Sequence, residues 1–228
     1  MNAAQPEQSS IPNWKGGAWF HGVGNRKLGM WLFILSDSLT FAALLVSYIY
    51  LRVASSVWPR PFSFSPEILF ATLMTLCLLV SSWTMAKAVK ASSRGDRAKL
   101  TNWLLTTIAA GIAFVAMHLV EWNRLLGDLV EWNYLFGLGF RPFGIQNAGH
   151  DAVPASWGET ASPLFGSVFF AITGFHLLHV LSGLIYLTVL ATRRGTTREA
   201  VEICGLYWQF VDVVWLIIFP AIYLFSMK

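Results

Sequence analysis

Two aspartates and two histidines of this chain stand within apolar sequence, where they could accept, hold or pass a proton. Asp37 and Asp212 lie among aromatic and branched apolar residues, and His176 and His179 stand three positions apart in another such stretch. A carboxylate inside a membrane costs several kcal/mol unless it is paired, hydrogen-bonded, hydrated or protonated. We therefore expect these four side chains to have polar partners or to handle protons.

Three kinds of chemistry fit the histidines. As residues i and i+3 of a helix, His176 and His179 share a face and could bind a metal with a carboxylate as a third ligand, although a catalytic metal needs about three protein ligands. They could instead form hydrogen bonds that fix helix packing, or take part in a proton relay. Cys77 and Cys204 form no Cys-x-x-Cys pair, which excludes a redox motif, a copper–thiolate centre and an iron–sulfur cluster.

The elements that position these groups are membrane-spanning helices. Hydrophobic residues make up 55% of the chain and charged residues 12%, against about 25% charged in soluble domains. We predict an all-α integral membrane protein: a tail over 1–27 and a single membrane domain over 28–228, with an outer loop at 127–161. Five windows can cross about 30 Å of hydrocarbon as helices. They are 28–53, 66–89, 100–126, 162–192 and 204–227.

The basic residues predict the orientation. Of the 16 Lys and Arg residues, 11 lie on the side shared by the N-terminus and the second and fourth loops, so this side is predicted to be cytoplasmic and the C-terminus to lie outside. No basic run is interleaved with aromatics, so nucleic acid is not an expected partner. The densest basic cluster either sets topology alone or also binds anionic lipid head groups. It comprises Lys87, Lys90, Arg94, Arg97 and Lys99.

Helical rise places the four membrane groups at similar depths. Asp37 lies about 13 Å and Asp212 about 12 Å from the inner ends of their spans, and His176 and His179 about 10–15 Å from theirs. We predict that they form one polar layer shared by three helices. His118 and Glu121 are predicted to lie near the outer end of the third span.

Three separated runs resemble subunit III of the haem–copper respiratory oxidases. They are Leu28 to Asp37, Phe169 to Val180, and Glu202 to Trp215. The runs occur in the family's order, and the resemblance extends over essentially the whole chain from about residue 27. The chain is similar to the five-helix bacterial form of the subunit.

The resemblance implies an accessory role. In that family, subunit III binds no haem or copper, packs against catalytic subunit I, holds phospholipids in a cleft between helix groups and supports proton uptake and turnover. Haem and copper are therefore expected in partner subunits of a bacterial inner-membrane oxidase, within a larger respiratory supercomplex if one forms, and the first two spans are expected to line one side of the cleft. The family's buried polar positions fall on Asp37, Glu121, His176, His179, Glu202 and Asp212, to which we add His118.

Some residues depart from the family's pattern. Asp37 stands where cytochrome c oxidases typically carry Glu, whereas the quinol oxidase branch resembles this chain in its Ser-Asp pair. Gln209 replaces a usual histidine, and His118 stands where glutamine is common. The electron donor of the complex is therefore either cytochrome c or quinol.

Two other classes of membrane protein could use the same residues. A stand-alone proton or ion transporter would use the buried polar groups without haem-bearing partners, and a membrane metalloenzyme would use the histidine pair. The chain contains five histidines, of which His21 and His150 lie outside the predicted spans. The remaining histidines are too few to ligate two haems and a copper, so we expect structure and electrostatics from this chain and electron transfer from others.

Overall fold

A computed structural model describes residues 24–55, 58, 68–126, 164–193 and 195–225, and the secondary structure of these residues is helical. Its helices are α1 (Asn25–Ala54), α2 (Leu69–Ser93), α3 (Arg97–Leu126), α5 (Leu164–Thr192) and α6 (Arg198–Ile218), which continues as the π-helix η3 (Phe219–Leu224). Within the described residues, five helices are long and apolar enough to cross a membrane. The predicted all-helical membrane bundle is confirmed, while the outer loop at 127–161 and residues 1–23 of the tail lie outside the described residues.

Helix α6 begins six residues earlier than its hydropathy predicts, at Arg198 and not at Cys204. The hydroxyl of Thr197 accepts a hydrogen bond from the backbone N–H of Ala200 at 3.3 Å, which caps the first turn. Glu202 then pairs along the same helix with Arg198, at 2.7 Å. Local capping and charge pairing therefore extend the helix beyond the apolar segment that the membrane requires.

The connection between α2 and α3 is a tight turn. Gly95 adopts a φ of 71°, the left-handed conformation that commonly ends a helix. The Asp96 carboxylate accepts a hydrogen bond from the backbone N–H of Lys99 at 3.1 Å and lies 2.8 Å from the Lys99 ammonium. These bonds hold the pKa of Asp96 below its usual value and cap the start of α3.

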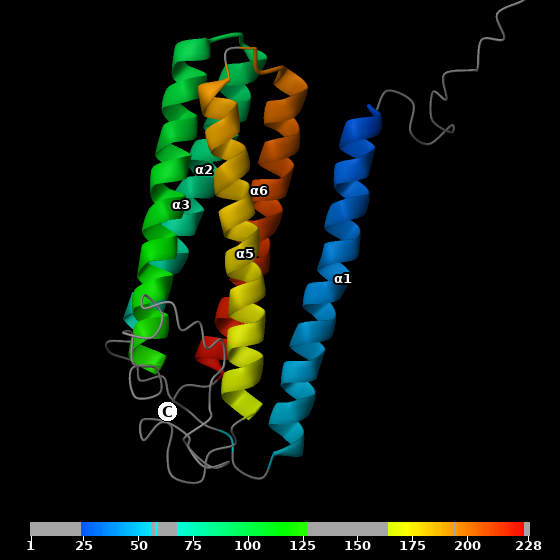
Figure 1. Ribbon diagram of the computed structural model, residues 1–228, viewed down its shortest axis with the longest axis vertical. Helices are drawn as coiled ribbons and strands as arrows, with labels where there is room; N and C mark the ends of the chain where they lie inside the picture. Colours follow the sequence, from blue (N-terminus) through cyan, green and yellow to red (C-terminus); the bar gives the residue numbers. More distant parts are fainter. Residues whose placement is uncertain (1–23, 56–57, 59–67, 127–163, 194, 226–228) are drawn as a thin grey trace, which may run out of the picture.

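The helices divide into a packed group and one peripheral helix (Figure 1). α2 packs against α3 and α6, α5 packs against both α3 and α6, and α1 lies against α5 and α6 on the side away from α3. Within the most apolar window of each span, 17% of α1 is buried against 56% of α6. α1 and α2 share α6 as a packing partner, and the expectation that the first two spans line one side of a lipid cleft stays a prediction.

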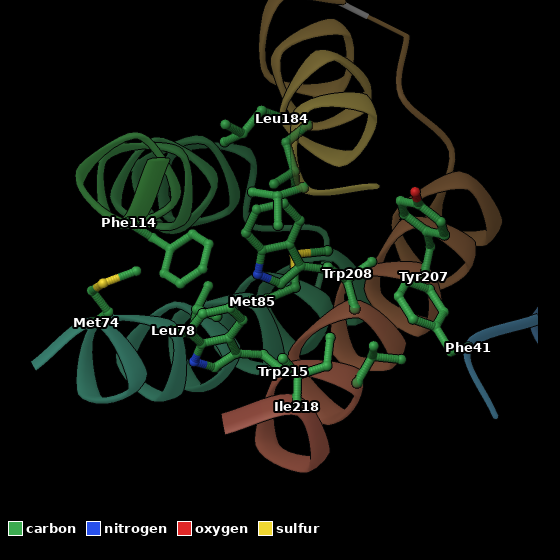
Figure 2. Close-up of a cluster of buried hydrophobic side chains, with 14 of the residues drawn as sticks. Phe41, Met74, Leu78, Met85, Phe114, Leu184, Tyr207, Trp208, Trp215 and Ile218 are labelled. Carbon is green, nitrogen blue, oxygen red and sulfur yellow. The ribbon is translucent and has the colours of Figure 1, made fainter. Parts of the chain in front are cut away.

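Two tryptophans of α6 fill the middle of the bundle (Figure 2). The indole N–H of Trp208 donates to the Ser81 hydroxyl, and that of Trp215 donates to the Thr75 hydroxyl, both at 3.1 Å. Both rings are fully buried. They join α6 to α2 through polar bonds inside an otherwise apolar core, which fixes the register between the two helices.

Candidate functional site

Asp37 of α1 and His179 of α5 face each other near the middle of the membrane domain. Asp37 Oδ2 lies 3.2 Å from His179 Nε2, and the two side chains are 10% and 13% exposed. The approach is less well aligned than an ideal hydrogen bond, and Asp37 Oδ2 has no other polar partner among the residues described. This contact brings together two of the residues predicted for the polar layer.

The ring of His179 is held from several sides. Its Nδ1 lies 2.7 Å from the Phe175 carbonyl oxygen. Phe41 of α1 and Phe175 make edge contacts with the ring, with centroid distances of 5.4 and 4.6 Å. Tyr207 of α6 donates its hydroxyl hydrogen bond to the His179 carbonyl oxygen at 3.1 Å, so that α1, α5 and α6 meet at this residue.

A second polar cluster lies near the C-terminal end of α3. The Tyr223 hydroxyl is 2.7 Å from Glu121 Oε2, and His118 Nδ1 is 3.4 Å from the same oxygen. All three residues are buried. Tyr223 belongs to the π-helix η3, whose wider turn changes the direction in which α6 presents its last side chains.

His176 lies beside this second cluster and not beside Asp37. Its ring contacts Phe114 of α3 and Trp215 of α6, at centroid distances of 5.9 and 5.1 Å. His118 contacts the same two rings, at 5.6 and 5.5 Å. Both histidines are fully buried, and no ring nitrogen of either has a well-aligned hydrogen bond within the described part of the chain.

Asp212 of α6 lies beside α2, apart from both clusters. It is 4% exposed and interacts with the hydroxyl side chain of Ser82 on α2, although neither of its carboxyl oxygens has a well-aligned hydrogen bond to a described residue. Asp212 therefore joins neither Asp37 nor the two histidines. The residues predicted to form one layer occupy three separate places in the bundle.

Glu202 lies at the end of the bundle where α6 begins. It accepts from Lys27 of α1 at 3.2 Å and from Arg198 at 2.7 Å. Its contacts are thus with cations at a helix end and not with the buried histidines.

The predicted head-group cluster lies at the same end of the bundle. Lys87 lies over the ring of Trp83 at 5.0 Å, Lys99 pairs with Asp96, and Arg97 donates to the backbone carbonyl of Arg193. These three side chains are therefore already engaged within the protein.

Sequence reasoning missed Tyr207 and Tyr223, the two tyrosines that complete the clusters. Pro220 within the last span was an available signal, because proline disturbs the α-helical hydrogen-bond ladder and so indicates a change of register. The predicted metal alternative has no geometric support within the described residues, where no group of three His, Cys, Asp or Glu side chains is placed to hold an ion.

The sequence profile of the family described as Cytochrome c oxidase subunit III matches residues 143–227. Cytochrome bo(3) ubiquinol oxidase subunit 3 of Pseudomonas putida is 30% identical over 203 residues, which cover 86% of this chain and 84% of that protein. Cytochrome c oxidase subunit 3 of Synechocystis sp. is 32% identical over 206 residues, with 87% and 75% covered. Probable cytochrome c oxidase subunit 3 of Mycobacterium tuberculosis is 32% identical over 203 residues, with 86% of both chains covered. This multi-pass membrane chain belongs to the subunit III family of the haem–copper respiratory oxidases.

Proposed function

We propose that this chain is the accessory subunit III of a bacterial haem–copper terminal oxidase in the inner membrane, with its N-terminus in the cytoplasm. It stabilises the catalytic subunit, binds phospholipids at its surface and supports proton uptake, while haem and copper reside in partner subunits. The observation that carries this proposal is the similarity to oxidase subunits along nearly the whole chain, including 86% of the Mycobacterium tuberculosis protein.

The surface of the bundle fits a subunit surrounded by lipid and other helices. Large apolar side chains of α1 are exposed, among them Leu39 at 66% and Val53 at 81%. Apolar surface of this kind is normal toward hydrocarbon and available for contact with a neighbouring transmembrane helix.

Cytochrome c is our proposed electron donor for the complex, and quinol is the alternative. The first proposal rests on the Synechocystis and Mycobacterium tuberculosis relatives, which are cytochrome c oxidase subunits, and the alternative rests on the Ser36-Asp37 pair and the Pseudomonas putida relative, a ubiquinol oxidase subunit. Purified complex supplied separately with reduced cytochrome c and with a quinol distinguishes the two.

Purification in mild detergent through a tag on the C-terminus tests the subunit assignment. We expect haem-bearing subunits to co-purify at fixed stoichiometry. Removing this chain from the complex should leave the haem spectrum intact and shorten sustained turnover, because the chain supplies no haem ligand. Collapse of the haem spectrum would contradict the accessory role. Purification without haem, with proton flux through vesicles containing this chain alone, would favour the transporter alternative.

A further inference from the structure

Helix α1 packs against α5 and α6 through a few aromatic contacts, such as that of Phe41 with Phe175, and through a few polar contacts. It is the least buried of the five spans, with 17% of its most apolar window inside the protein. Within a bilayer, lipid tails solvate apolar side chains about as well as a neighbouring helix does, so apolar contact alone gives little drive for association. The few polar contacts along α1 therefore have a large influence on whether it stays docked.

Among the described residues, α1 makes polar contacts with α5, α6 and the end of η3, near each of its own ends and in its middle. At one end Lys27 pairs with Glu202 at 3.2 Å, and at the other the Arg52 guanidinium donates to the Phe225 carbonyl. The Lys27 and Glu202 side chains are partly exposed, at 37% and 24%, whereas the Asp37 and His179 side chains are only 10% and 13% exposed. The middle contact is the one at which a change of charge is least screened by water.

The hydrogen bonds of His179 determine how many protons the middle contact holds. The Phe175 carbonyl oxygen can only accept, so the Nδ1 atom 2.7 Å away carries a hydrogen. Nε2 faces Asp37 Oδ2 at 3.2 Å, and one further proton between these atoms makes their approach attractive. That proton resides either on Asp37, facing neutral His179, or on Nε2, facing the Asp37 carboxylate. Its transfer between the two atoms leaves the pair neutral.

Any other proton count places a net charge at this position. Loss of the shared proton leaves the Asp37 carboxylate facing the lone pair of Nε2, and a second proton leaves a net positive charge. The nearby groups do not compensate: α6 contributes Tyr207, α5 contributes Ser182 and His176, and Lys27 is ten residues along α1, or about 15 Å away. Either charged state favours separation of the two side chains and entry of water.

We propose that Asp37 and His179 form a binding site for one shared proton, and that docking of α1 onto α5 and α6 requires this site to be singly occupied. The inference stands on the geometry of α1 and goes beyond the role of the chain as an oxidase subunit. It makes α1 a helix whose attachment is controlled by a proton.

The test uses the full chain in lipid nanodiscs, with spin labels on α1 and α5 and pulsed electron paramagnetic resonance over a pH series. Val46→Cys and Ile185→Cys provide label positions that are 64% and 68% exposed, in a background with Cys77→Ala and Cys204→Ala. We expect one dominant distance at neutral pH. At alkaline pH that population should be lost and replaced by longer, broader distances.

Asp37→Asn is the decisive variant, because its amide can donate to Nε2 of neutral His179 and has no proton to lose. It should keep the neutral-pH distance at alkaline pH. His179→Gln keeps the ionisable Asp37 carboxyl, so a net charge still appears when that carboxyl loses its proton, and this variant should retain the alkaline transition. Glu202→Gln is the control: it changes the contact of Glu202 with Lys27 and should retain the alkaline transition of the parent protein. The proposal is overturned if the parent shows no transition, or if a folded Asp37→Asn protein retains it.

Discussion

Gly183→Ala should destabilise the bundle, because the new methyl group would meet the ring of Trp208. A Cβ at this position would lie 2.8 Å from both Cε3 and Cζ3 of Trp208, whereas carbon atoms in contact are normally about 3.5–4.0 Å apart. One of these groups must therefore move by about 1 Å.

Trp208 has little room to move. On its other side, a Cβ at Gly111 would lie 2.9 Å from Cη2, and the indole N–H is bonded to Ser81 at 3.1 Å. Overpacking of this kind costs about 1–3 kcal/mol, and the better helix propensity of Ala offsets up to about 1 kcal/mol. With the full offset, we expect a net loss of about 0–2 kcal/mol in the free energy of unfolding, and a loss of about 1–3 kcal/mol relative to an unstrained Gly→Ala substitution in a helix.

Reversible unfolding in mixed micelles, followed by circular dichroism, measures this loss. Gly29→Ala is the matched control, because nothing lies within 4 Å of its Cβ position on α1. In a Trp208→Phe background the cost of Gly183→Ala should fall, since the smaller ring leaves space for the methyl group. The reasoning is refuted if Gly183→Ala unfolds no more easily than Gly29→Ala, or if its cost is unchanged in the Trp208→Phe background.

Further predictions concern the second cluster and the helix ends. Tyr223→Phe removes the 2.7 Å bond to buried Glu121 and should lower the free energy of unfolding by about 1–3 kcal/mol, measured in the same micelles. Lys99 holds the pKa of Asp96 below its usual value, so the stabilisation of the α3 start by Asp96 is present above the pKa of Asp96 in the unfolded chain and is lost as pH falls through its pKa in the folded chain. Hydrogen exchange in the first turn of α3 should rise as this stabilisation is lost, and Asp96→Asn should abolish this pH dependence. Thr197→Ala removes the cap of α6 and should cost about 1 kcal/mol, with faster exchange confined to its first turn.

The five spans were predictable because membrane thickness fixes the length of an apolar helix. Their ends were less so: α6 starts at Arg198, where capping and an ion pair extend it beyond its apolar segment. The pairing of helices was not predictable from hydropathy, and α1 lies against α5 and α6 although α2 follows it in sequence. Helix association in membranes depends on small residues, such as Gly183 against Trp208, and on hydrogen bonds between helices. Hydropathy averaged over a window of residues contains no information on either.

The candidate site illustrates the difference between depth and direction. Rise per residue gave similar depths for Asp37, His179 and Asp212, but a helix turns its side chains by about 100° per residue, and depth contains no information on which neighbour a side chain meets. His176 and His179, three positions apart, differ in direction by about 60°. That difference suffices to direct His179 toward Asp37 and His176 toward Trp215.

The division into separate clusters bears on how protons could be handled here. A relay needs polar groups within hydrogen-bonding reach or linked by water, and Asp37 with His179 forms such a contact at the peripheral helix, whereas Glu121, His118 and Tyr223 are enclosed by the packed group. A change in one cluster therefore need not alter the other. Substitutions in the two clusters should accordingly be additive in their effects on stability, and Asp37→Asn combined with Tyr223→Phe measures this directly: a large interaction energy would show that a connection joins them.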